Sequence, residues 1–234
     1  MYARKTKGVN KKAVVAAIVL VAVLAVGAAA VVLYSFQGHA AKTTAKVGVK
    51  VGDYFSYELT GEANGPVPST ISPDFSIYNN TDYYKVTVTA IEGTKVTLDT
   101  VWAFKNGTTV NNPQTIDLAS GILTDQNGFY ALYPADMVKN QLVYPHVYSG
   151  VWVNGTDPLD YSSGSRQINY YTATGTLYYS QDPTHSTQCS TWDQVSWDKT
   201  TGMLTNLISA RNYNNPQLST EILWTLTSTN LWTV

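Results

Sequence analysis

Hydrophobic and polar positions divide the chain into two parts. Residues 13–36 (AVVAAIVLVAVLAVGAAAVVLYSF) carry no charged side chain, whereas the later residues mix apolar and polar side chains at short intervals. As a helix rising 1.5 Å per residue, this run covers about 36 Å, enough to cross a hydrocarbon core of about 30 Å. The run predicts a transmembrane helix that is kept as a signal anchor.

The charges beside this run predict its orientation. Residues 1–12 contain five Lys and Arg, and no Asp or Glu occurs before Asp53. Because positive residues stay on the cytoplasmic side, we expect a cytoplasmic basic tail and a single pass through the cytoplasmic membrane, with the C-terminal part outside the cell. Two alternatives stay open: cleavage as a signal peptide near 28–30 or 38–40, and prepilin-type cleavage after Gly8.

Residues 37–52 are expected to form a tether between the helix and the outer part. Within it, Val47, Val49 and Val51 alternate with Gly48 and Lys50. A period of two is typical of a strand. Such a strand would pair with its own sheet or, as in donor-strand exchange, with the sheet edge of a neighbour.

From residue 53 to residue 234, short alternating segments are separated by turn residues, which predicts strands. Two hairpins stand out, one formed by residues 84–91 and 95–104 and one formed by residues 195–198 and 203–209. Further strands are expected at 54–60, 115–118, 129–133, 147–153, 166–173, 176–179 and 221–227. The chain passes from strand to strand through short turns, so we expect one antiparallel meander of about nine or ten strands.

Two segments interrupt this pattern. Residues 61–81 read as a long polar loop with three Pro. Residues 134–141 (PADMVKNQ) are the expected short helix, because Pro134 suits the first helical position and Asp136 suits the first turn. The predicted fold class is therefore mainly β, a half-barrel or a sandwich with at most one short helix after the transmembrane helix.

Composition and charge narrow the choice of partners. Charged residues make up only 13% of the chain, which contains 17 Tyr and 6 Trp. After the apolar run, ten Lys and Arg face sixteen Asp and Glu, so this part carries about −6. An acidic domain is a poor match for nucleic acid, and no nucleic-acid partner is expected.

Several short motifs, taken in their order along the chain, resemble membrane-anchored archaeal surface proteins of unknown function. The motifs are Val51–Phe55, Val86–Val96, Lys105–Thr108, Ile116–Gly121, Gly164–Arg166 and Trp197–Leu204.

The aromatic-Asp-x-x-x-Gly-apolar hairpin at Trp197–Met203 also resembles hairpins of LolA/LppX-like lipoprotein carriers. In that family a curved sheet holds lipid on its concave side, so the resemblance implies an apolar-lined groove. The chain departs from that family by lacking a lipobox Cys and by offering one covering helix.

Catalytic and metal-binding patterns are not found in the sequence. His39, His146 and His185 lie far apart without ligand spacing, and no G-x-S-x-G occurs. The acidic residues fall mostly at turn positions, where Asp caps backbone N–H groups. We therefore expect no metal site, no cofactor and no enzymatic activity.

Aromatic residues in the second half are the candidate ligand-binding site. The candidates are Tyr170, Tyr171, Tyr178, Tyr179, Trp192 and Trp197. Tyr and Trp are enriched both at binding surfaces and in sheet cores, so both interpretations stay open. Arg166, at a strand start, would bind a carboxylate of a ligand or of the protein itself.

Three N-x-Ser/Thr sequons, at Asn79, Asn106 and Asn154, fall in expected loops on the outer side and are candidate glycosylation sites. Cys189 is the only cysteine, which excludes a disulfide within the chain. It is either a buried small hydrophobe or a reactive thiol.

These patterns support two functional hypotheses. The first is a non-enzymatic, membrane-anchored cell-surface domain that binds an apolar ligand, a lipid or a protein partner in a concave sheet face. The second is a structural subunit that assembles through sheet edges and through a tether that does not fold onto its own domain. A hydrolase is a distant third.

Overall fold

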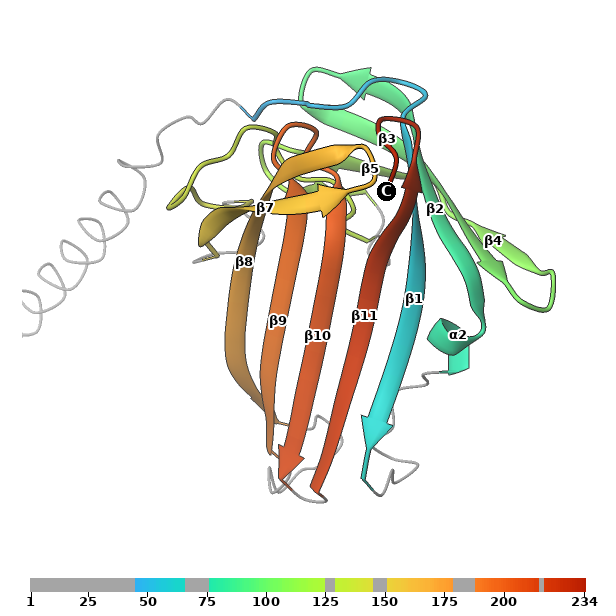
Figure 1. Ribbon diagram of the computed structural model, residues 1–234, viewed down its shortest axis with the longest axis vertical. Helices are drawn as coiled ribbons and strands as arrows, with labels where there is room; N and C mark the ends of the chain where they lie inside the picture. Colours follow the sequence, from blue (N-terminus) through green and yellow to red (C-terminus); the bar gives the residue numbers. More distant parts are fainter. Residues whose placement is uncertain (1–44, 66–75, 125–128, 145–150, 179–187, 215–216) are drawn as a thin grey trace, which may run out of the picture. The chain divides into compact units, whose positions relative to one another are not determined.

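The computed structural model describes residues 45–65, 76–124, 129–144, 151–178, 188–214 and 217–234 (Figure 1). The predicted tail, transmembrane helix and first part of the tether lie outside the described residues. Residues 44–234 form a compact unit by themselves. None of the helices in the described ranges is long and apolar enough to cross a membrane.

The described residues form one antiparallel sheet. Its strands are β1 (Tyr54–Asn64), β2 (Thr81–Glu92), β3 (Lys95–Phe104), β4 (Thr109–Asn111), β5 (Gln114–Asp117), β6 (Ile122–Leu123), β7 (Gly155–Tyr161), β8 (Gly164–Tyr178), β9 (Gln188–Asp198), β10 (Leu204–Asn214) and β11 (Gln217–Thr229). Their order is β6-β5-β3-β2-β1-β11-β10-β9-β8-β7, and β4 pairs with β3. The predicted antiparallel, meander-like sheet is confirmed.

Two meanders make up this sheet. The first contains β1 to β6 and the second contains β7 to β11, and they meet where β1 pairs with β11 (Figure 1). The first and last strands therefore lie side by side in the middle of the sheet. The sequence pattern did not predict this non-local pairing.

Both predicted hairpins are confirmed, β2–β3 by the pairing of Glu92 with Lys95 and β9–β10 by the pairing of Trp197 with Leu204. In the second turn, the Asp198 carboxylate accepts hydrogen bonds from Thr201 N and Thr201 Oγ1, both 2.8 Å long. Gly202 has φ +79°, and a Cβ there would overlap the carbonyl oxygen of Tyr133. This turn therefore needs glycine both for its backbone conformation and for its close packing.

The helix predicted at residues 134–141 is wrong. Asp136 and Asn140 have φ values of 57° and 67°, which an α-helix cannot contain. The N–H of Ala135 donates to Lys46 O and that of Asp136 to Lys199 O, so these groups bond to other segments of the chain. The only helix among the described residues, α2 (Ser76–Asn79), lies instead in the predicted loop 61–81.

The strands predicted at 129–133 and 147–153 are also wrong, as far as the structure describes them. Only the isolated bridges Leu132 with Met203 and Leu142 with Trp152 occur there. The apolar residues of these segments are nevertheless buried, including Ala131, Leu132, Tyr133 and Val153. Their apolar pattern reflects a buried connection, which periodicity alone cannot distinguish from a strand.

This connection, residues 129–144 and 151–153, is called the covering segment below. It lies over one face of the sheet, called the covered face, and its rings stack on the sheet. Phe129 stacks on Trp224 with ring centroids 3.9 Å apart, and Tyr133 stacks on Trp197 at 4.7 Å. The hydrophobic core lies between this segment and the sheet, and it includes Tyr57, Val86, Leu98, Trp197 and Leu204.

The described part of the tether lies on its own domain without joining the sheet. Ala135 N donates to Lys46 O at 2.8 Å, and the Lys46 ammonium pairs with Asp136. Val49 is buried, with 5% of its surface exposed. The strand expected from the alternation of Val47 to Val51 is wrong, because none of these residues belongs to a strand, and Gly48 lies close to Ala135 of the covering segment and to Thr200 of the β9–β10 turn.

Candidate functional site

The opposite face of strands β8 to β11 carries a groove. Successive side chains of a strand point to opposite faces of its sheet. Tyr170 alternates with Tyr171, Ser196 with Trp197, and Thr225 with Trp224, where the second member of each pair is a core residue. Tyr170, Ser196 and Thr225 therefore belong to the other face, called the groove face.

The β7–β8 hairpin forms one wall of this groove. Asp157 lies directly opposite Ile168, and Leu159 directly opposite Arg166, so the side chains of each pair point to the same side. Figure 1 shows β7 crossing in front of β9 and β10. The space enclosed is about 480 Å³. Its apolar walls are Pro158, Leu159, Tyr161, Ile168, Tyr170 and Val234, and its floor includes the polar residues Gln194, Ser196 and Asn206.

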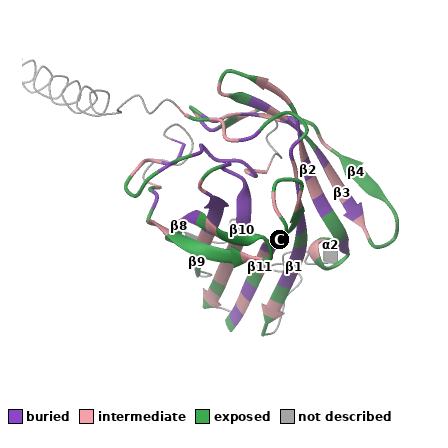
Figure 2. Ribbon diagram, turned by 45° about the horizontal axis from the view of Figure 1, so that its top comes forward, coloured by how far each residue is buried: buried purple, intermediate pink, exposed green. Residues whose placement is uncertain are grey.

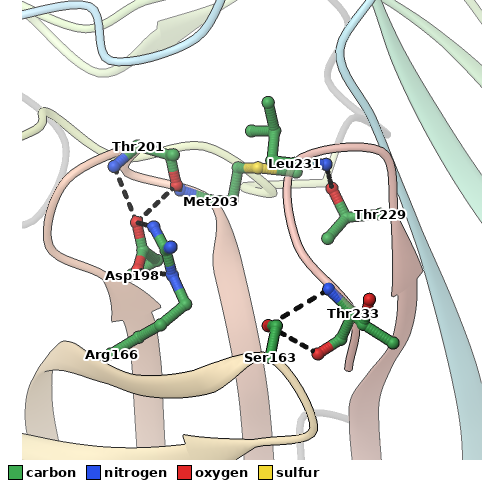
Figure 3. Close-up of polar contacts among 8 residues, drawn as sticks. All are labelled: Ser163, Arg166, Asp198, Thr201, Met203, Thr229, Leu231 and Thr233. Carbon is green, nitrogen blue, oxygen red and sulfur yellow. Dashed lines mark hydrogen bonds and ion pairs between the residues drawn. The ribbon is translucent and has the colours of Figure 1, made fainter.

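Residues 231–234 close one side of the groove by binding the β7–β8 turn (Figure 3). Ser163 N and Ser163 Oγ both donate to Thr233 O, at 3.3 and 2.9 Å, and Thr233 N donates to Ser163 Oγ at 3.2 Å. Ser162 Oγ adds a 3.1 Å hydrogen bond to Val234 O. These contacts join residues about seventy positions apart and hold the hairpin over the sheet.

Arg166 also helps to hold residues 231–234 beside the groove. Its guanidinium donates from Nε and Nη2 to the buried Asp198 carboxylate, at 2.7 and 3.1 Å (Figure 3). The same group lies 4.0 Å from the centroid of the Trp232 ring, a cation–π contact. Arg166 is therefore engaged by the protein itself, and its role here is to hold Trp232 beside the groove.

Tyr161 lines the groove as an uncharged side chain. Burial, with a smaller effect of the Asp198 charge, raises the pKa of Tyr161 to about 12, although the Arg166 charge and the Thr205 hydroxyl act in the opposite direction. The phenol is therefore protonated at neutral pH. Among the groove side chains that the structure describes, only Asp157 is charged, and it forms no ion pair within the described ranges.

The aromatic candidates from the sequence do not form one cluster. Tyr171 and Trp197 are buried on the covered face, with ring centroids 6.0 Å apart, while Tyr170 lines the groove. Trp192 pairs with Ala210 on the groove face, further along the strands, and is half-buried. Tyr178 ends β8 but its side chain lies outside the described residues, as does Tyr179. The pleat separates the neighbours Tyr170 and Tyr171.

Several groove residues were not found from the sequence. Leu159 and Tyr161 belong to β7, which lies between the predicted strands 147–153 and 166–173 and was not predicted, whereas Ile168 looks like an ordinary strand residue. One usable signal was present: Pro158 inside a strand marks an edge strand. An edge strand can fold back over its sheet, which is how β7 reaches the groove.

The remaining candidate residues lie elsewhere. No group of three or more His, Cys, Asp or Glu in the described ranges could hold a metal ion. His39, His146 and His185 lie outside the described residues. Cys189 is buried, and burial raises the pKa of its thiol, which fits a small hydrophobe better than a reactive group.

Comparison with models of protein families and with curated proteins finds no match to this chain. The resemblances to archaeal surface proteins and to lipoprotein carriers therefore stay predictions. The function has to be argued from the groove itself.

Proposed function

We propose that this chain is a non-enzymatic, membrane-anchored binding protein of the cell surface, whose half-barrel domain holds an apolar ligand in the groove. The groove itself carries this proposal. Its volume of about 480 Å³ lies within the range of about 300–1,000 Å³ that is usual for small-molecule sites. It is bounded by the sheet, the β7–β8 hairpin and residues 231–234, which hydrogen bonds hold together.

The lining supports an amphiphilic ligand. Aliphatic and aromatic side chains form the walls, and neutral amides and hydroxyls such as Gln194, Ser196 and Asn206 lie on the floor. This combination is usual for ligand sites, in which apolar contact supplies affinity and a few polar groups fix orientation. A lipid-like molecule with an apolar body and a small polar group fits this chemistry.

The location in the cytoplasmic membrane rests on the sequence. Residues 13–36 are long enough to span the membrane, and the basic residues before them favour a cytoplasmic N-terminus. The domain would then stand outside the cell next to the bilayer. A membrane is also a ready source of an apolar ligand.

The sheet edges favour ligand binding over assembly by strand addition. Edge strand β7 contains Pro158 and the exposed Asp157 and Asp160, while β4 and β6 at the other edge have three and two residues. Proline, charge and short length are the devices that keep sheet edges from pairing with other chains. The contacts of Lys46 and Val49 also keep the described part of the tether on its own domain.

Photocrosslinking tests the proposal on the full chain in its membrane. A neutral long-chain alcohol that carries a diazirine should label peptides containing Leu159 and Ile168, and an excess of unlabelled alcohol should prevent this labelling. Ser196→Phe fills the floor of the groove and should abolish labelling at these peptides. Thr174→Phe, on the same face but outside the groove, should leave it unchanged.

Gln194→Trp is a second filling variant in case Ser196→Phe fails to fold. Labelling that is scattered over the surface, or that survives both filling variants in folded protein, would contradict a ligand in the groove. Circular dichroism of each variant separates loss of binding from loss of fold.

A further inference from the structure

Of the three sequons, we propose that Asn106 is the one that carries an N-linked glycan. All three lie in the part of the chain expected outside the membrane, so sequence alone does not separate them. The structure does, because the Asn and Thr side chains of each sequon are engaged differently.

The sequon at Asn79 is closed by hydrogen bonds. Asn79 Nδ2 donates to Gly61 O at 2.9 Å, and its Oδ1 accepts from Gly61 N at 3.0 Å. The buried Thr81 hydroxyl donates to Ile77 O and accepts from Trp102 Nε1, at 2.9 and 2.7 Å. Asn79 is exposed, but its amide is bonded to the Gly61 backbone, and the Thr81 hydroxyl that a glycosyltransferase has to recognise is buried.

The sequon at Asn154 leads directly into the sheet. Asn154 Oδ1 accepts from Thr172 N at 2.6 Å, and Asn154 N donates to Tyr170 O at 2.9 Å. Thr156 lies in β7 opposite Asn169, and its hydroxyl donates to Asn169 Oδ1 at 2.6 Å. Recognition of this threonine would require the β7–β8 hairpin to open.

The sequon at Asn106 is presented on an exposed turn between β3 and β4. Asn106, Gly107 and Thr108 are all exposed, and Gly107 takes φ +85° to close the turn. Asn106 Oδ1 accepts from Thr108 N at 3.0 Å and from Thr108 Oγ1 at 2.7 Å. Its Nδ2 donates no hydrogen bond to any residue that the structure describes, so the reacting nitrogen is accessible.

This local geometry suits the transfer reaction. The hydroxyl of Thr108 polarises the Asn106 carbonyl, which makes the Nδ2 protons easier to remove. A membrane-bound transferase would supply the base and a polyprenyl-phosphate-linked oligosaccharide. Nδ2 then bonds to the anomeric carbon, one amide proton goes to the base, and the bond from that carbon to the phosphate oxygen breaks, releasing the polyprenyl phosphate.

A glycan at this position would shield the β4 edge of the sheet. Residues 109–111 of β4 are all exposed, and Val110 has 54% of its surface exposed (Figure 2). The strands β3, β2 and β1 separate this edge from β11, where the groove begins. The glycan would therefore cover an apolar edge residue and leave the ligand site open.

Peptide mass spectrometry of the full chain purified from its native membrane tests this site. The peptide containing Asn106 should carry a glycan mass that is absent from the peptides containing Asn79 and Asn154. Asn106→Gln and Thr108→Ala should remove it, whereas Thr108→Ser should retain it. Asn79→Gln and Asn154→Gln should leave the mass on Asn106 unchanged. An unmodified Asn106 peptide, or a glycan on Asn79 or Asn154 instead, would overturn the proposal.

Discussion

The covered face and the groove face are formed by the same strands, but the first is packed against the covering segment and the second borders an open groove. On the covered face, Tyr171, Trp197 and Trp224 are sealed by rings that the chain itself supplies from the covering segment. On the groove face, the neighbours Tyr170, Ser196 and Thr225 border an open space. The face with the larger aromatic side chains is therefore core, and the more polar face keeps room for a ligand. Aromatic richness alone does not identify a binding surface.

The largest expected difference between the faces is in stability. Trp197→Ala removes a fully buried ring that stacks on Tyr133, and it should lower the free energy of unfolding by about 3–5 kcal/mol. Tyr170→Ala removes a partly exposed ring and should cost less than about 2 kcal/mol. Urea unfolding of both variants measures the difference. Equal losses would mean that the two faces are not distinct.

The next effect concerns how tightly the covering segment approaches the sheet. Gly202→Ala forces a left-handed alanine into the carbonyl of Tyr133, whereas Gly93→Ala meets no atom within 4 Å at a similar φ. We expect a loss of about 3 kcal/mol at Gly202 and about 1 kcal/mol at Gly93. Thermal or urea unfolding measures the loss of stability in the two variants. Similar losses would show that the covering segment shifts readily to make room for the added Cβ.

A smaller effect should appear in ligand preference at the groove face. Asp157 is the only charged groove side chain in the described ranges, and Arg166 cannot neutralise it because it is paired with Asp198. A long-chain amine should therefore bind about two- to fivefold more tightly than the matching carboxylate at low salt. Competition in the crosslinking assay measures this ratio. Asp157→Asn should bring it close to one, and an unchanged ratio would remove Asp157 from the explanation.

A pH dependence of stability also arises beside the groove. The pKa of Tyr161 is about 12 in the folded chain, chiefly through burial, against 10.0 for a free tyrosine. The unfolded chain therefore loses this proton first, so the stabilising contribution is complete below pH 10 and disappears as pH rises towards 12.

Tyr161→Phe should reduce this alkaline fall in the free energy of unfolding, as followed by urea unfolding at several pH values. Part of the alkaline fall should persist in this variant, because burial also raises the pKa of Tyr171 to about 12. An identical fall in wild type and Tyr161→Phe would mean that Tyr161 is exposed.

The sequence predicted several local parts of this fold but missed strand β7 and the non-local pairings. The hairpins at Glu92-Gly93 and Lys199–Gly202 follow from turn chemistry and alternation within a few residues. The covering segment was mistaken for a helix and two strands, because its apolar residues are buried by contact with β9 and β11, far away along the chain. The pairing of β1 with β11 leaves no local signal at all.

The candidate site shows the same division. The alternation that predicted the strands also places Tyr170 and Tyr171 on opposite faces, so their separation could have been derived from the sequence. The contact of Ser163 with Thr233 joins residues 70 positions apart and could not. Arg166 illustrates both cases. The sequence predicted that it would bind a carboxylate, but it did not identify Asp198 as that partner or Trp232 as a neighbour.

The pairing of the first strand with the last has a consequence for how the chain folds during synthesis. Thr229 Oγ1 donates to Tyr54 O across 175 residues, and the β1–β11 ladder depends on such distant pairs. During synthesis, β1 lacks this neighbour until almost the entire domain has been delivered. Folds dominated by non-local pairs form slowly and expose unpaired strands while they wait. We therefore expect the two meanders to form first and the domain to acquire its full cooperativity only when β11 joins them.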